Sequence, residues 1–150
     1  MGSVTKLFVA PVAALQQIAD SSSAQFPSSG ATLEYLSEIA LVRLQALIDG
    51  ITGWDEHFDA VAIQFESEPY AESRADDGGW SRMIPERSIR SIAALIDADI
   101  NRLAAVWGHP DTHAGQTLSL ADAAAMIRAV RDISLQALTQ GSAVIFSTHE

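Results

Sequence analysis

The chain has 150 residues, of which 48% are hydrophobic and 19% are charged, and its formal net charge is −10 at pH 7. This length and composition predict one globular domain over residues 1–150 and exclude a disordered chain. The acidic excess disfavours nucleic-acid binding, because the phosphates would be repelled. The chain has no cysteine, which excludes disulfides and thiolate sites. The lack of disulfides fits a cytoplasmic protein.

The first third of the chain is predicted to contain a strand and two helices. Residues 4–9 are β-prone, and Pro11 suits the first turn of a helix that runs to about Asp20. After a loop rich in Ser, Pro and Gly, Thr32 is the expected N-cap of a second helix, which ends at Asp49. Because the apolar residues of this second helix spread beyond one stripe, we expect it at the centre of the core.

The middle of the chain is predicted to contain one strand, a long connection and a helical region. Residues 51–59 are expected to form a turn or short helix, and residues 60–66 alternate between apolar and more polar positions, as a half-buried strand does. Residues 67–84 are predicted to be an irregular connection, which in a compact domain is usually functional or mobile. Helical spacing then holds over residues 85–107, with a break expected near residue 97.

The last third is predicted to contain a long helix and a strand. Ser119 followed by Asp122 indicates the start of the helix, which runs to Gln140 with Gly141 as its C-cap. Residues 143–148 are β-prone and form the last predicted strand. The three predicted strands must pair with one another to satisfy their backbones. We therefore expect an α+β fold, a single domain with a small three-stranded sheet packed with four or five helices.

Three stretches share a pattern of apolar residues, glycines and helix starts: residues 33–53, 78–96 and 138–148. Together with the opening Met1-Gly2 before a strand and a helix, they resemble the YfbM-like family of uncharacterised bacterial proteins. The stretches look like that family's long central helix, its Gly-aromatic segment with a Pro-started helix, and its closing helix, glycine and strand. The family's central helix usually carries a Trp and a His, and residues 39–44 supply neither. The resemblance implies an α+β single domain and no catalytic residues.

One candidate metal site lies between the predicted helical region at residues 85–107 and the last predicted helix. His109, Asp111 and His113 are metal-binding residue types within five positions. Pro110 argues against a helix that would align the two imidazoles, and a third strong ligand is not nearby in the sequence. A solvated polar loop is the simpler interpretation, so we predict no metal and no cofactor.

A second titratable cluster holds Asp55, Glu56 and His57, which are the residue types of an acid–base pair. Adjacent residues rarely face the same way, and a charged turn is the simpler interpretation. The sequence has no Gly-x-Ser-x-Gly, dinucleotide-binding or Walker motif and no cysteine nucleophile. Enzyme activity is therefore left open, with a non-catalytic protein favoured.

Residues 55–77 hold most of the charge imbalance, with eight acidic residues against Arg74 alone, a net charge of −7. Trp54 and Trp80 flank this segment and Tyr70 lies within it, and aromatic anchors within an acidic rim are typical of a surface that binds a basic protein. Aromatic residues of the core are the alternative interpretation. Because residues 60–66 are expected in a strand, the exposed charge should lie at residues 55–59 and 66–77. The predicted protein-binding residues are Glu66, Glu68, Tyr70, Glu72, Asp76, Asp77 and Trp80.

These features favour a non-catalytic acidic protein-binding domain, such as an immunity protein or an antitoxin-like inhibitor that blocks a basic toxin. One alternative is an enzyme of unrecognised type that uses His57, His109 or His113 with carboxylates. The other is an uncharacterised cytoplasmic homodimer, joined through an apolar helix face, whose acidity only maintains solubility. No membrane partner is predicted, because no apolar stretch approaches the roughly 18 residues that a transmembrane helix needs.

Overall fold

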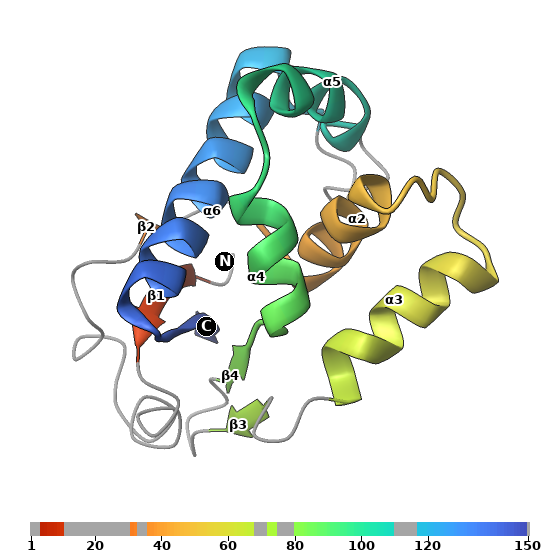
Figure 1. Cartoon of the computed structure of the whole chain (residues 1–150). Coiled ribbons are helices and arrows are strands. Elements are labelled where there is room, and N and C mark those ends of the chain that lie inside the picture. The colour runs from red at the N-terminus through yellow and green to blue at the C-terminus, as the bar shows by residue number, and fades with distance from the viewer. Residues whose placement is uncertain are drawn as a thin grey trace.

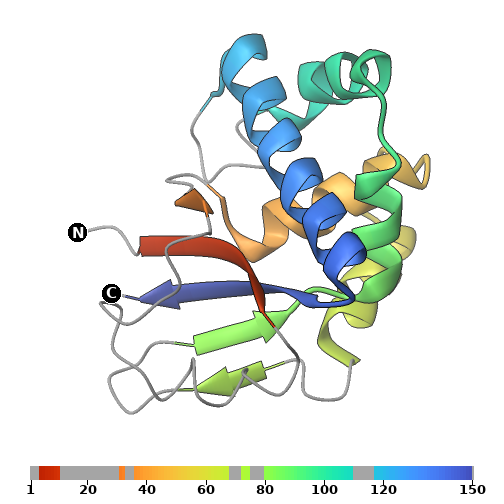
Figure 2. The same ribbon diagram turned by 60° about the vertical axis from the view of Figure 1, so that its left-hand side comes forward.

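The computed structural model of the chain describes residues 4–10, 31–32, 36–67, 72–74, 80–109 and 117–149. Within these ranges, a five-stranded sheet forms one layer and five helices lie together beside it (Figures 1 and 2), which confirms the α+β class. The strands are β1 (Val4–Ala10), β2 (Ala31–Thr32), β3 (Glu72–Arg74), β4 (Trp80–Met83) and β5 (Ala143–His149), and the helices are α2 (Glu38–Ile48), α3 (Glu56–Ser67), α4 (Glu86–Ala93), α5 (Asp97–Trp107) and α6 (Leu120–Gln140).

The sheet is built around β1 and β5, which pair antiparallel along all seven residues of each strand. Leu7 and Phe146 face each other in register and belong to the core beside the helices. Phe8 and Ile145 form the next register pair and have no exposed surface. Because successive side chains of a strand point to opposite faces, the sheet is buried on both faces at this point. The strands expected at residues 4–9 and 143–148 are confirmed.

The prediction of a three-stranded sheet is wrong, because the described residues already form five strands in the order β2-β1-β5-β4-β3. Strands β3 and β4 lie within residues 67–84, which we expected to be irregular throughout. Both are short, β3 is entirely polar, and β4 has apolar residues only at its two ends, so neither shows the alternating apolar pattern that marks a half-buried strand. Backbone pairing with β5 places β4 in the sheet, and β3 follows as the partner of β4.

The strand predicted at residues 60–66 is also wrong, because these residues belong to helix α3. Val61 is buried and Ile63 is 62% exposed, whereas a strand would put both on one face. Phe58 and Val61, three positions apart, are buried together as one helical face requires. Asp55 begins the helix: its carboxylate Oδ1 accepts a hydrogen bond from the backbone N of His57 at 3.0 Å.

Helix α2 runs through the centre of the core, as predicted, and every residue from Ala40 to Leu47 is buried. The helix starts later than we expected. Its N-cap is Ser37, whose hydroxyl accepts a hydrogen bond from the backbone N of Ala40 at 3.2 Å. Thr32 was predicted as the cap and instead lies in β2, in register with Lys6 of β1. Ser and Thr are both common N-caps, so residue type alone did not decide between the two positions.

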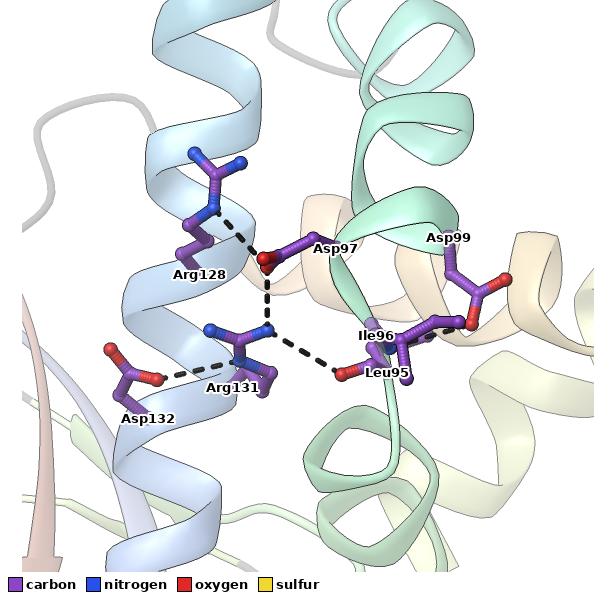
Figure 3. A network of polar contacts seen from close by, with 7 residues as sticks. All are labelled: Leu95, Ile96, Asp97, Asp99, Arg128, Arg131 and Asp132. Atoms are coloured by element: carbon purple, nitrogen blue, oxygen red, sulfur yellow. Dashed lines mark hydrogen bonds and ion pairs between the residues drawn. The ribbon is translucent and has the colours of Figure 1, made fainter.

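The break expected near residue 97 is confirmed, because α4 ends at Ala93 and α5 begins at Asp97. Figure 3 shows how α6 holds the turn between them. Arg131 of α6 donates from Nη1 to the Leu95 carbonyl oxygen at 3.5 Å and to Asp97 Oδ1 at 3.2 Å, and its Nε contacts Asp132 Oδ1 at 3.4 Å. The Nε of Arg128 lies 3.8 Å from the same Asp97 oxygen. Two arginines of α6 therefore fix the first residue of α5.

The last helix, α6, has both predicted ends. Ser119 accepts a hydrogen bond from the backbone N of Asp122 at 3.0 Å, and Gly141 ends the helix in the left-handed conformation with φ 65°. The helix predicted from Pro11 to about Asp20 lies outside the described residues. In the part of the chain that the structure describes, no helix is long and apolar enough to span a bilayer.

Replacing Gly141 by alanine is expected to lower the free energy of unfolding by about 1 kcal/mol, because a Cβ disfavours the left-handed conformation. Apart from its neighbours in the chain, no described residue has an atom within 4 Å of the place that this Cβ would occupy, so the cost is conformational and not steric. Urea unfolding followed by circular dichroism measures the change. Gln140→Ala, at the exposed end of the same helix, should leave stability within about 0.5 kcal/mol of the wild type. Equal stability of both variants would contradict the prediction.

Candidate protein-binding surface

Helix α3 lies at one edge of the molecule (Figure 1), and it carries exposed acidic residues. Among the described elements, it packs on α2 through Phe58 and Val61. On the opposite side, Glu56, Asp59 and Ile63 are exposed and lie at the three- and four-residue spacings that align side chains along a helix. We call these three residues the α3 outer stripe. It combines two carboxylates with an isoleucine that is 62% exposed, so it offers charge and apolar surface together.

A buried arginine holds the turn that leads into α3. Arg43, in the middle of α2, is only 5% exposed. Its Nη2 donates to the Thr52 carbonyl oxygen at 2.6 Å and its Nη1 to the Gly53 carbonyl oxygen at 3.2 Å. Its guanidinium carbon lies 4.6 Å from the centre of the Trp54 ring, a cation–π contact. The Trp54 ring in turn lies 4.6 Å from that of Phe58, which carries the contact into α3.

A second polar link joins α2, α3 and α4. Arg87 of α4 donates to Asp49 Oδ2 at 2.6 Å and to Gln64 Oε1 of α3 at 3.2 Å. The other oxygen of Asp49 accepts from Gln45 Nε2 at 3.0 Å. Gln45 is fully buried, and its Oε1 has no hydrogen-bond partner among the residues that the structure describes. The Asp49 carboxylate is thus held from both sides and ties the end of α2 to its neighbours.

The predicted binding residues are spread over three elements and two segments outside the described residues. Glu66 lies in the last turn of α3, Glu72 lies in β3 and Trp80 lies in β4. In the sheet register, Glu72 is opposite Arg82, and Trp80 is opposite Arg74. The remaining predicted residues lie outside the described residues: Glu68, Tyr70, Asp76 and Asp77.

The exposure expected for residues 55–59 is confirmed at Asp55, Glu56 and Asp59, which are all exposed. The exposure of Ile63 was not predicted, because a strand over residues 60–66 would place this side chain on the buried face. The signal that would have found it is the acidic helix start: Asp55 as N-cap and carboxylates in the first turn. Trp54 is 46% exposed and lies beside the acidic residues, as an aromatic anchor would.

The two histidines considered for chemistry that the structure describes lie in separate places. His57 is exposed in the first turn of α3, and His109 is exposed just beyond the end of α5. Asp111 and His113 lie outside the described residues. The Asp55 carboxylate beside His57 serves as a helix cap. No group of three or more metal-binding side chains occurs among the residues that the structure places.

A groove of about 410 Å³ lies between α4 and the end of α6. Its polar side chains include Glu86 and Arg90, which form an ion pair of 2.7 Å with each other. These two side chains carry opposite charges, so the described lining of the groove has no net charge that would favour a charged ligand. It is lined by Met83, Ile84, Glu86, Ile89, Arg90, Ala137, Leu138, Gly141, Ser142 and Ala143.

Comparison with protein-family models finds no family that matches the chain. Comparisons with curated proteins and with solved structures find no significant match either. Inferences about function therefore depend on the chain's own residues.

Proposed function

We propose that the protein is a non-catalytic binding domain that uses the acidic face of α3 to bind a basic protein surface. The observation that carries the proposal is the α3 outer stripe, in which Glu56, Asp59 and Ile63 are exposed side by side. Carboxylates attract and orient a basic partner, and an exposed isoleucine among them supplies apolar area that is buried on contact. Glu66, Glu72 and Trp80 extend this surface in the proposal.

The charge of the whole segment supports the same choice of partner. Residues 55–77 carry a net charge of −7, and α3 contains no lysine or arginine to neutralise its carboxylates. A surface of one sign raises the rate at which oppositely charged proteins associate, and added salt weakens this attraction. Small acidic immunity proteins and antitoxins that occlude a basic toxin have this chemistry, and we propose this class for the chain, acting in the cytoplasm. The resemblance to the YfbM-like family is compatible with the proposal and stays a prediction.

Replacing Asp59 by lysine is expected to weaken binding of a fluorescein-labelled octa-arginine peptide about tenfold at low ionic strength. Asp59 is exposed, and its reversal removes one attraction and adds one repulsion, each worth up to about 1 kcal/mol. Fluorescence anisotropy at several salt concentrations measures the affinity. The difference between wild type and variant should shrink as salt is added, because exposed charges are screened.

Asp122→Lys is the matched control. Asp122 is also an exposed aspartate in the first turn of a helix, so both variants make the same change in net charge and in helix-terminal electrostatics. It should retain most of the wild-type affinity, because it lies on α6. An equal loss for both variants, or an affinity indifferent to salt, would show that α3 is not the binding surface. Copurification with a basic protein encoded by the neighbouring gene would identify the partner.

A further inference from the structure

Arg43 occupies an unusual place for a charged residue. It lies in the middle of a run of buried residues in α2 and is itself only 5% exposed. A charge is costly to remove from water unless polar groups compensate it, and the contacts of Arg43 supply that compensation. Its guanidinium reaches out of α2 to two carbonyl oxygens, those of Thr52 and Gly53, at 2.6 and 3.2 Å. Both carbonyls belong to the turn that carries α3.

The contacts of Arg43 continue into α3 itself. The guanidinium carbon of Arg43 lies 4.6 Å from the centre of the Trp54 ring. The centre of that ring lies 4.6 Å from the centre of the Phe58 ring. Phe58 and Val61 are the two fully described residues of α3 that are buried in the core. One side chain of α2 therefore fixes the turn, the aromatic pair at its end and, through Phe58, the buried face of α3.

The other polar contact described between α3 and a neighbouring helix is weaker. Arg87 donates to Gln64, but the Arg87 side chain is 48% exposed, and exposed polar contacts contribute little. By contrast, α6 packs on α4, α5, β1 and β5. Segments with few buried contacts open locally at a lower free energy than the core does. The turn and α3, residues 51–67, are thus held to the described helical layer mainly by α2, through the contacts of Arg43 and the apolar contacts of Phe58 and Val61.

We propose that Arg43 is a positioning residue: it holds residues 51–67 against α2 in one orientation, so that the α3 outer stripe is presented preformed. Without its contacts, this segment separates from α2 while the sheet and the other helices stay folded. Preorganisation lowers the entropic cost of binding, which is how Arg43 would contribute to partner affinity. That last link rests on the proposed function, whereas the local opening does not.

Hydrogen exchange measured by mass spectrometry on the full chain tests the proposal. In Arg43→Met, the amides of residues 56–67 should exchange roughly ten to a hundred times faster than in the wild type, because hydrogen bonds from a charged donor are lost. The amides of α5 and α6 should keep their wild-type rates. Arg43→Lys keeps the charge but not the fork that reaches two carbonyls, so it should give an intermediate rate.

Arg131→Met is the reciprocal control, because Arg131 also holds a backbone carbonyl and a turn, that between α4 and α5. It should accelerate exchange at the start of α5 and leave α3 unchanged. If Arg43→Met does not fold, Trp54→Leu, which removes the ring under the guanidinium, should accelerate α3 by a smaller factor. The proposal is overturned if α3 keeps its wild-type rate, or if all helices accelerate equally. Failure of the octa-arginine experiment alone would reject the proposed function and leave this result standing.

Discussion

Replacing Trp107 by alanine should lower the free energy of unfolding by about 3–5 kcal/mol, the range for deleting a buried aromatic side chain. Trp107 ends α5 and has no exposed surface. Its indole Nε1 donates to the Ala40 carbonyl oxygen of α2 at 2.8 Å. The substitution therefore removes a large apolar volume and a buried hydrogen bond at once. Urea unfolding monitored by circular dichroism measures the loss, and the native signal at zero denaturant shows whether the variant still folds.

Trp107→Phe separates the two contributions, because it keeps an aromatic ring and loses the indole donor. We expect a loss of about 1–3 kcal/mol, from the smaller ring and the unpaired carbonyl. Trp54→Phe is the control, since Trp54 is 46% exposed and should tolerate the change within about 1 kcal/mol. Similar losses at the two positions would contradict the assignment of Trp107 to the centre of the core.

Long periodic segments were predictable from the sequence because one physical pattern decided them. The start of α6 follows from Ser119 and its end from Gly141, because these two residues satisfy the free backbone groups at the helix ends. The central position of α2 follows from apolar residues on more than one side. Strands β1 and β5 were found for a similar reason: their runs of β-prone residues are uninterrupted by polar ones at the core positions.

Helix α3 shows where that reasoning fails. In the sequence, Val61, Ile63 and Phe65 alternate with less apolar neighbours, and a period of two predicts a strand. The pattern that predicts a helix is the pair Phe58 and Val61 on one face. This pair spans only one turn of a helix of twelve residues, so the helical pattern is short. The acidic cap at Asp55 and the first-turn carboxylates were local signals for the helix. If these signals are given more weight than the alternation, the sequence predicts a helix with Ile63 exposed.

The acidic composition of residues 55–77 was visible in the sequence, but its arrangement was not. A charge count cannot distinguish one exposed stripe from charges spread over several elements. Helix α3 aligns Glu56 and Asp59 on one side. The pairing of β3 with β4 instead places Glu72 opposite Arg82, where a positive residue neighbours the acidic one. Among the acidic residues of this segment whose side chains the structure describes, Glu56 and Asp59 therefore share one exposed helical face.

Replacing Gln45 by glutamate is expected to destabilise the protein by about 3 kcal/mol at pH 7, although the two side chains have nearly the same shape. Gln45 is fully buried, and its Nε2 donates to Asp49 Oδ1 at 3.0 Å. The substitution would place an ionised carboxylate out of water and beside another carboxylate. Burial and the like charge both raise the pKa of the introduced carboxyl above its usual value of about 4.3.

The sign of the pH dependence follows from that shift. Below about pH 4 the introduced carboxyl is protonated in both the folded and unfolded chains, so its ionisation costs nothing. As the pH rises above about 4.3, the unfolded chain ionises first, and the variant loses about 1.4 kcal/mol per pH unit relative to the wild type until the raised pKa is reached. Urea unfolding of both proteins at pH 4, 5.5 and 7 measures this difference.

Gln64→Glu makes the same chemical change at an exposed position in contact with Arg87. It should be neutral or slightly stabilising at pH 7, because the new carboxylate lies in water and beside a cation. A destabilisation of Gln45→Glu that does not grow with pH would show that the introduced group is solvated. In that case water would reach the side chain at position 45, and the Gln45 Oε1 atom would accept hydrogen bonds from it.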